Sequence, residues 1–235
     1  MNQPVAKFYA FLDRPMRLWA RFFIVALVLL LPLAFLSPLW RISMEAPQYP
    51  GGLYMDIHAH KLVGGNDGQH IAEINTLNHY IGMRPIVPED FDDLDWMPFA
   101  LGFLALLALR TAAIGNVRSL VDMAAVTFYV LAFLAARFVY RLHVYGHELD
   151  PHAAFDIEPF MPVIIGTKQI ANFTTHSGPQ LGSLWITLFA LGIGFTMVWH
   201  LVTGRRDASR AEARTSAVPR EQQRAGLSEP PVVSA

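Results

Sequence analysis

Imidazole side chains gather in two parts of this sequence. Eight of its nine histidines lie within residues 41–95 and 141–182. They are His58, His60, His70 and His79 in the first part and His143, His147, His152 and His176 in the second. Neutral imidazole is the commonest protein ligand of transition metals, so this distribution predicts a metal-binding surface. Because the chain contains no cysteine, the other ligands would be methionine, carboxylate or backbone groups.

Two histidine pairs have spacings that place both rings on one side of an element. His58 and His60 fall in a partly alternating stretch that predicts a short strand, where they would share a face. His143 and His147 would share a face if the preceding helix continues, although Gly146 weakens that helix. The structural alternatives are a solvent-facing polar edge for the first pair and a hydrogen-bonded exit from the membrane for the second.

A third candidate pairs an imidazole with a thioether. His79 and Met83 are four residues apart and would share a face of one helical turn. The alternative is a buried methionine beneath a helix-capping histidine. Histidine with methionine and no thiolate favours copper over zinc. The candidate metal ligands are therefore His58, His60, His79, Met83, His143 and His147.

The same inventory excludes other cofactors. Without cysteine there is no attachment for c-type haem and no thiolate zinc site. A transmembrane b-type haem needs histidines from two spans, and only His200 falls in one, which argues against it. The sequence also lacks phosphate-binding and hydrolase motifs, and nothing indicates nucleic-acid binding.

Four apolar stretches must position these residues. The chain is 53% hydrophobic, and four segments approach the roughly 20 residues that a membrane-spanning helix needs. The predicted spans are residues 22–40, 96–114, 120–140 and 184–202. We expect an all-α integral membrane protein with four transmembrane helices and two long folded extracytoplasmic loops. These loops, 41–95 and 141–182, should pack together as a cap, with a short helix near residues 162–173.

Positive charge predicts the orientation. Twelve of the 18 basic residues lie in residues 1–21, in the connection near residues 110–118 and in the tail after residue 204. The positive-inside rule makes this side cytoplasmic, so both termini are inside and the long loops face the periplasm. Residues 1–21 form a cytoplasmic basic lead-in, and residues 204–235 a disordered cytoplasmic tail. The expected location is the cytoplasmic (inner) membrane.

Three phrases carry a family resemblance. They are residues 46–53 (APQYPGGL), 77–83 (LNHYIGM) and 145–151 (YGHELDP). With them the chain resembles the NosB-like polytopic membrane accessory proteins of nitrous-oxide reductase gene clusters, over about residues 18–202. The resemblance implies a place beside an extracytoplasmic copper enzyme, and it carries His79, Met83 and His147 into a copper-handling or docking role.

Two functions follow as hypotheses. The first is a membrane-anchored accessory protein that handles copper for an extracytoplasmic copper enzyme, such as nitrous-oxide reductase, or docks that enzyme or its chaperone. The second is a non-catalytic scaffold or electron-transfer subunit of a quinol-linked respiratory complex, with other membrane respiratory subunits as partners. The spans carry few ionisable residues at membrane depth, which argues against an embedded enzyme site.

Overall fold

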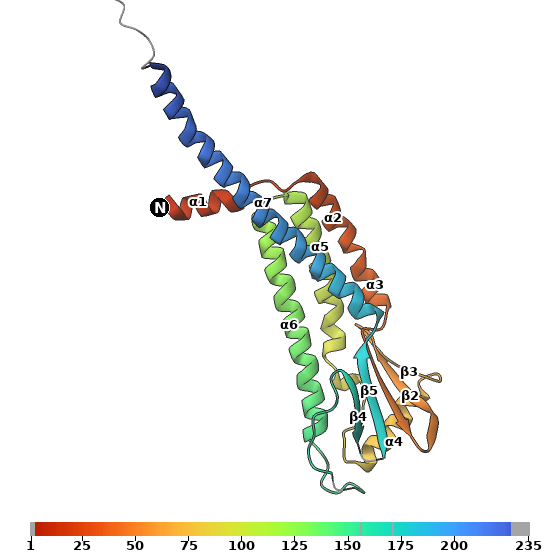
Figure 1. Ribbon diagram of the computed structural model, residues 1–235. Helices are drawn as coiled ribbons and strands as arrows, with labels where there is room; N and C mark the ends of the chain where they lie inside the picture. Colours follow the sequence, from red (N-terminus) through yellow and green to blue (C-terminus); the bar gives the residue numbers. More distant parts are fainter. Residues whose placement is uncertain (1–2, 156, 171, 227–235) are drawn as a thin grey trace, which may run out of the picture.

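A computed structural model describes residues 3–155, 157–170 and 172–226, and shows a helical bundle joined to a β-sheet (Figure 1). Four helical segments are long and apolar enough to span a membrane: Leu18–Leu36, Asp93–Ile114, Val117–His147 and Leu181–Arg205. Each overlaps one of the predicted spans, although the first covers Leu18–Leu36 rather than residues 22–40, because Trp40 already belongs to a strand. The four helices indicate a multi-pass membrane protein. Their shared core includes the fully buried side chains of Ile24, Leu104, Leu120, Phe189 and Ile193.

The first span is built from two helices. Helix α2 covers Leu18–Val28 and α3 covers Leu30–Leu36. Pro32 has no N–H to donate to the carbonyl of Val28, which accounts for the interruption at Leu29. A short helix, α1 (Gln3–Leu12), precedes them and projects sideways from one end of the bundle (Figure 1).

The second and third spans form a hairpin with clear sequence signals at its turn. Helix α5 (Asp93–Ile114) ends at Gly115, which adopts φ +71°. Helix α6 (Val117–His147) begins beyond Asn116, whose side chain accepts a hydrogen bond from the Ser119 N–H. Glycine and asparagine favour these two positions. At 31 residues, α6 is longer than a membrane requires, and its far end runs beside the sheet (Figure 1).

The fold class predicted from the sequence is wrong, because the protein is mixed α/β. Five antiparallel strands form one sheet in the order β3-β2-β1-β5-β4. The first long segment supplies β1 (Trp40–Ala46), β2 (Tyr49–Ile57) and β3 (Leu62–Gly64), followed by α4 (Gln69–Tyr80) and the 3-10 turn η1 (Pro88–Asp90). The second supplies β4 (Gly166–Ile170) and β5 (Phe173–Pro179). The short helix predicted near residues 162–173 is therefore also wrong.

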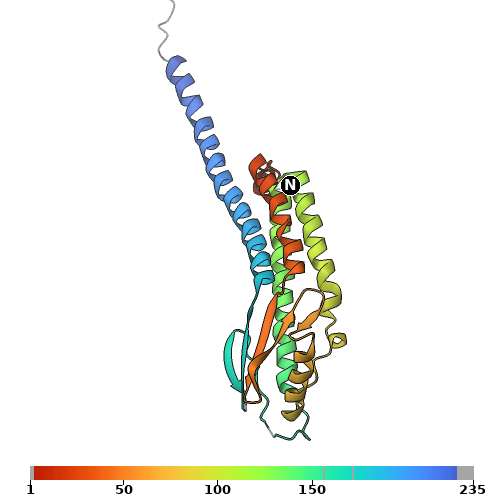
Figure 2. The same cartoon turned by 90° about the vertical axis from the view of Figure 1, so that its right-hand side faces the viewer.

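The sheet explains how the two long segments associate. Strand β1 pairs with β2 on one side and with β5 on the other, so the segments share one ladder. The predicted packing of the two segments into one cap is thus confirmed. The face of the sheet that meets α4 carries Met44, Met55 and Phe173, which pack with Ile74 and Leu77 of that helix. Figure 2 shows the sheet and α4 together at one end of the bundle.

Helix α7 follows strand β5 directly and contains the last span. It covers Leu181–Gly226 and continues beyond the bundle on the side opposite the cap (Figure 1). The predicted disordered tail began at residue 204, so the structure differs from that prediction over residues 204–226. Residues 205–218 contain neither Gly nor Pro and are rich in Ala, Arg and Glu, which favour helix. The remainder of the predicted tail, residues 227–235, lies outside the described residues.

Candidate functional site

The end of α6 beside the sheet presents a stacked pair of imidazoles. The helix does continue through Gly146, and the exposed rings of His143 and His147 stack with centroids 3.8 Å apart. The Nδ1 atom of His147 lies 2.9 Å from the carbonyl oxygen of His143. Because a carbonyl only accepts, Nδ1 carries the proton and the Nε2 of His147 keeps its lone pair for another partner.

Close packing explains why a glycine stands inside this helical turn. The 157–165 segment crosses α6 there, and the N–H of Phe160 donates to the carbonyl of Gly146 at 2.9 Å. A Cβ at residue 146 would collide with the Phe160 carbonyl oxygen. Gly146 therefore allows the 157–165 segment to pack closely against α6 and does not end the helix. His143 and His147 consequently lie on the same continuous helix.

His58 and His60 lie together, but not in a strand as predicted. Strand β2 ends at Ile57, and both histidines occupy the turn to β3, which His58 closes through its N–H to the carbonyl of Lys61 at 2.9 Å. The turn places Ala59, which is fully buried, in the core of the helices.

The environment of this turn favours uncharged imidazole. Burial, assisted by Lys61 and His60, lowers the pKa of His58. The ring of His60 stacks on Phe35 of α3 at 4.4 Å. The Nδ1 atoms of both histidines are buried and have no hydrogen-bond partner among the described residues. The two rings lie 6.1 Å apart, which is compatible with metal binding, but the stacking on Phe35 is also a sufficient structural role for His60.

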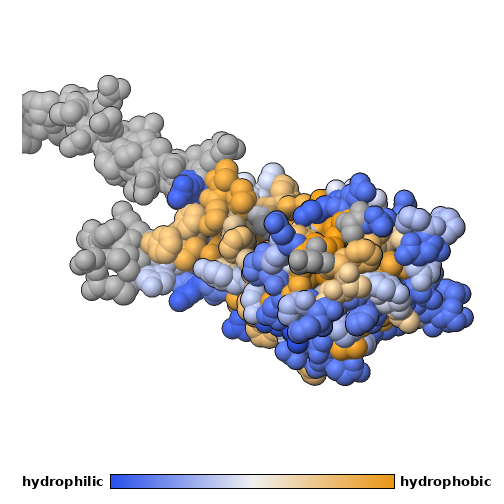
Figure 3. All heavy atoms as spheres, turned by 90° about the horizontal axis from the view of Figure 1, so that it is seen from below, coloured by the Kyte–Doolittle hydropathy of each residue, from blue (hydrophilic) through white to orange (hydrophobic). Residues whose placement is uncertain are grey.

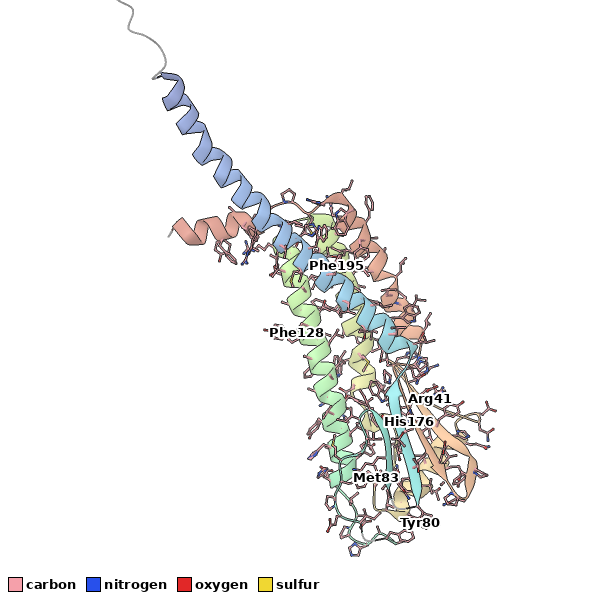
Figure 4. All side chains as sticks on the ribbon, in the orientation of Figure 1. Arg41, Tyr80, Met83, Phe128, His176 and Phe195 are labelled. Atoms are coloured by element: carbon pink, nitrogen blue, oxygen red, sulfur yellow. The ribbon has the colours of Figure 1, made fainter. Side chains whose placement is uncertain are left out.

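His79 and Met83 do not share a helical face, so this prediction is wrong. Helix α4 ends at Tyr80, and Gly82, at φ +75°, reverses the chain. The N–H groups of Gly82 and Met83 donate to the carbonyls of His79 and Asn78, the pattern of a Schellman cap. His79 is exposed, whereas Met83 is half-buried and lies between the end of α6 and the sheet (Figure 4).

Two of the sequence stretches that carried the family resemblance, residues 77–83 and 145–151, contact each other in the structure. The N–H of Asp150 donates to the carbonyl of Gly82 at 2.8 Å, and Arg84 pairs with Glu148 at 3.2 Å. A Cβ at Gly82 would lie 2.8 Å from the Asp150 carbonyl oxygen, so this approach requires glycine. His79 lines a surface hollow at this contact, and His147 lines an adjacent one.

These residues do not converge on a closed metal centre. Within the described ranges, no three His, Asp or Glu side chains are grouped closely enough to hold an ion. Asp150 instead pairs with His152, whose backbone N–H and ring lower the pKa of the Asp150 carboxyl. The six predicted ligands thus fall into one stacked pair at the end of α6, one half-buried pair beside the bundle, and two residues separated by a helix cap.

Several other histidines already have structural partners. The His70 ring bonds the Tyr54 N–H, and the His176 ring on the sheet bonds the Thr167 hydroxyl (Figure 4). His200 lies buried at the other end of the bundle, where its ring contacts the carbonyl of Thr196 and the N–H of Arg17. The histidines that lie close in the sequence therefore do not converge on one site in the structure.

Sequence reasoning missed a cavity between the sheet and the half of α6 that lies beside it. It has a volume of about 150 Å³ and apolar walls from the sheet, α4, α5 and α6. Four methionines line it: Met44, Met55, Met83 and Met97. No single stretch of sequence signals it, because its walls come from both long segments and from two spans.

A charged cluster lines this cavity near the start of α5. The guanidinium of Arg137 contacts both carboxylate oxygens of Asp93, at 2.9 and 3.1 Å. Arg141 lies 3.5 Å from both Asp92 and Asp93. Asp93 is at the first turn of α5, where a carboxylate also favours the helix dipole. The cluster ties the start of α5 to the outer part of α6.

Comparison with known proteins adds no relative. No family model matches the chain, and neither a curated protein nor a solved structure matches it. Function must therefore be argued from the residues and their geometry.

Proposed function

We propose that the protein is a membrane-anchored accessory protein of an extracytoplasmic copper enzyme, with nitrous-oxide reductase as the candidate enzyme. Its α/β cap would hold copper transiently, or dock the enzyme or its copper chaperone. The family resemblance supports this pathway, and the four apolar helices support the anchor. The end of the cap is covered mainly by hydrophilic residues, as expected of a surface that meets water and soluble partners (Figure 3).

The observation that carries the proposal is the stacked pair of His143 and His147. One ring is oriented by its own helix backbone, which is how metal-binding histidines are commonly fixed. Both rings are exposed, so a bound ion would keep open positions for a ligand from a partner. A carrier needs such an exchangeable site, whereas a closed cage would retain the metal.

The charge distribution supports a periplasmic cap. At the opposite end of the bundle, Arg14 bonds the carbonyl of Gly204, and Arg21 bonds the carbonyls of Ala112 and Ala113. Arg118 lies at the same end, 3.8 Å from Asp13. Basic residues at one end favour its cytoplasmic placement, with N and C termini inside and the cap outside.

The scaffold hypothesis is favoured by a different observation. His70 and His176 form hydrogen bonds within the cap, and His60 stacks on Phe35 of the bundle. If His143 and His147 serve likewise as contact residues, the protein is a subunit that holds partners in a quinol-linked complex and carries no metal.

Copper titration of the purified protein distinguishes the two. We expect about one Cu(I) bound per chain at pH 7.5, with His147→Ala weakening the affinity by roughly tenfold or more. His152→Ala is the matched control, since this histidine is exposed and lies near the same surface. If neither Cu(I) nor Cu(II) binds, or if His143→Ala and His147→Ala bind as the native protein does, the copper proposal fails.

A further inference from the structure

We propose that the cavity between the sheet and α6 binds one long-chain membrane amphiphile with a neutral, hydrogen-bonding head group. The inference does not depend on copper, because the cavity walls contain neither His143 nor His147. It rests on two unpartnered polar side chains, on the pairing of the nearby charges, and on the position and lining of the cavity.

Two buried polar side chains face this otherwise apolar space. Asn78 on α4 is 1% exposed, and Thr175 on β5 is 6% exposed. Both line the cavity, and the Asn78 amide oxygen and nitrogen and the Thr175 hydroxyl have no hydrogen-bond partner in the part of the chain that is described. Such groups are rarely left unpaired in folded proteins, since each costs the full penalty of its desolvation.

The two groups come from facing walls and offer complementary chemistry. Thr175 pairs in register with Met44 on the sheet, while Asn78 belongs to the helix that packs against the sheet. An amide and a hydroxyl each donate and accept hydrogen bonds. Together they suit a head group that carries carbonyl or hydroxyl oxygens.

The charges beside the cavity argue for a neutral head. The guanidinium of Arg137 is already engaged by both oxygens of Asp93. Arg141 faces Asp92 and Asp93. These carboxylates would repel an anionic head and compete for the arginines. An uncharged head avoids that competition and reaches the unpaired groups of Asn78 and Thr175.

The position of the cavity indicates a ligand drawn from the membrane. Its walls include Leu94 and Met97 of α5 and Leu134 and Phe138 of α6, all within candidate spans. They continue into the cap core at Met44 and Met55. The enclosed cavity measures about 150 Å³, which is enough for a ring-sized head group, and it is partly open at its surface. Flexible methionine walls adapt readily to an apolar chain.

Two membrane components share this chemistry: isoprenoid quinones, which present carbonyl or hydroxyl groups, and neutral glycerolipids, which present ester and hydroxyl groups. The test uses the full chain in phosphatidylcholine nanodiscs, titrated with decylubiquinone or with dioctanoylglycerol against empty nanodiscs. Saturable binding of one molecule per chain is expected for at least one probe. The preferred probe identifies the source.

Conservative variants locate the site. Thr175→Val and Asn78→Leu should each weaken binding about three- to tenfold, as loss of one hydrogen bond does. Thr196→Val is the matched control, because this buried threonine bonds the Gly192 carbonyl on α7, away from the cavity. Copper binding should be unchanged in all three variants.

A stability measurement guards against a purely structural role. Without added probe, Thr175→Val should melt at the same temperature as the native protein or higher, since it removes an unpaired hydroxyl. A lower melting temperature would show that the hydroxyl has a structural partner, and would overturn the inference. So would the absence of saturable binding, native-like binding by both cavity variants, or tighter binding of dioleoylphosphatidylglycerol than of either neutral probe.

Discussion

His58 is the residue whose protonation the folded cap opposes most directly. Burial against the bundle, with Lys61 and His60 nearby, lowers the pKa of its imidazole below the usual value near 6.5. The unfolded chain therefore binds a proton more readily than the folded one. The stabilisation is complete above about pH 6.5 and is lost as the pH falls through that value towards the lower folded pKa.

The lowered pKa of His58 leads to a prediction for thermal melting in detergent. The melting temperature should fall between pH 7.5 and 5.5, and His58→Gln should reduce the slope of that fall. His152→Gln serves as the control for loss of an exposed imidazole. An unchanged slope in His58→Gln would show that another group sets the acid sensitivity of the cap.

Residue spacing predicted some of these environments and not others. The four-residue spacing of His143 and His147 was sufficient, because the helix around them is long and continuous. The same spacing misled at His79 and Met83, where Gly82 ends the helix after Tyr80. Thr175 and Asn78 carried no signal at all, since an unpaired buried group is defined by what surrounds it.

At the scale of elements, the outer end of α6 depends on its contact with the 157–165 segment. A methyl group at residue 146 would strike the Phe160 carbonyl, and such overpacking costs about 1–3 kcal/mol. Alanine would regain about 0.5–1 kcal/mol of helix preference. The collision involves backbone, which cannot rotate away, so it outweighs the gain.

Gly146→Ala should therefore destabilise the protein by about 1 kcal/mol or more, measured by denaturant unfolding. Gly102→Ala in α5 is the matched control, because a Cβ there meets nothing within 4 Å. The substitution at residue 146 should also weaken copper binding if the stacked histidines are displaced. Equal stability of the two variants would mean that the 157–165 segment moves away freely.

The helices were predictable from sequence and the sheet was not, for one physical reason. A membrane span needs a long, uniform apolar run, and each of the four has one. Strands β4 and β5 are rich in threonine, glycine and serine, and their buried positions include Thr175 and Ser177. Their hydrophobic alternation is therefore weak, and β1, which pairs with β5, lies more than 120 residues earlier in the chain.

At the scale of the whole molecule, the α/β cap and the basic end occupy opposite ends of the bundle. The proposed function requires the cap to face the periplasm, where a soluble copper enzyme can reach it. The chain has no cysteine, so single introduced cysteines report topology without background. Gln69 at the start of α4 and Asp13 near the start of the first span are both exposed and mark the two ends.

We predict that Gln69→Cys is labelled by a membrane-impermeant maleimide from the periplasmic side. Asp13→Cys should be labelled only after the inner membrane is permeabilised, because the arginines at that end favour the cytoplasm. Fully permeabilised cells provide the control that both thiols are reactive. The reverse pattern would place His143 and His147 in the cytoplasm and remove the basis for service to an extracytoplasmic enzyme, while leaving the cavity between the sheet and α6 open to a membrane ligand.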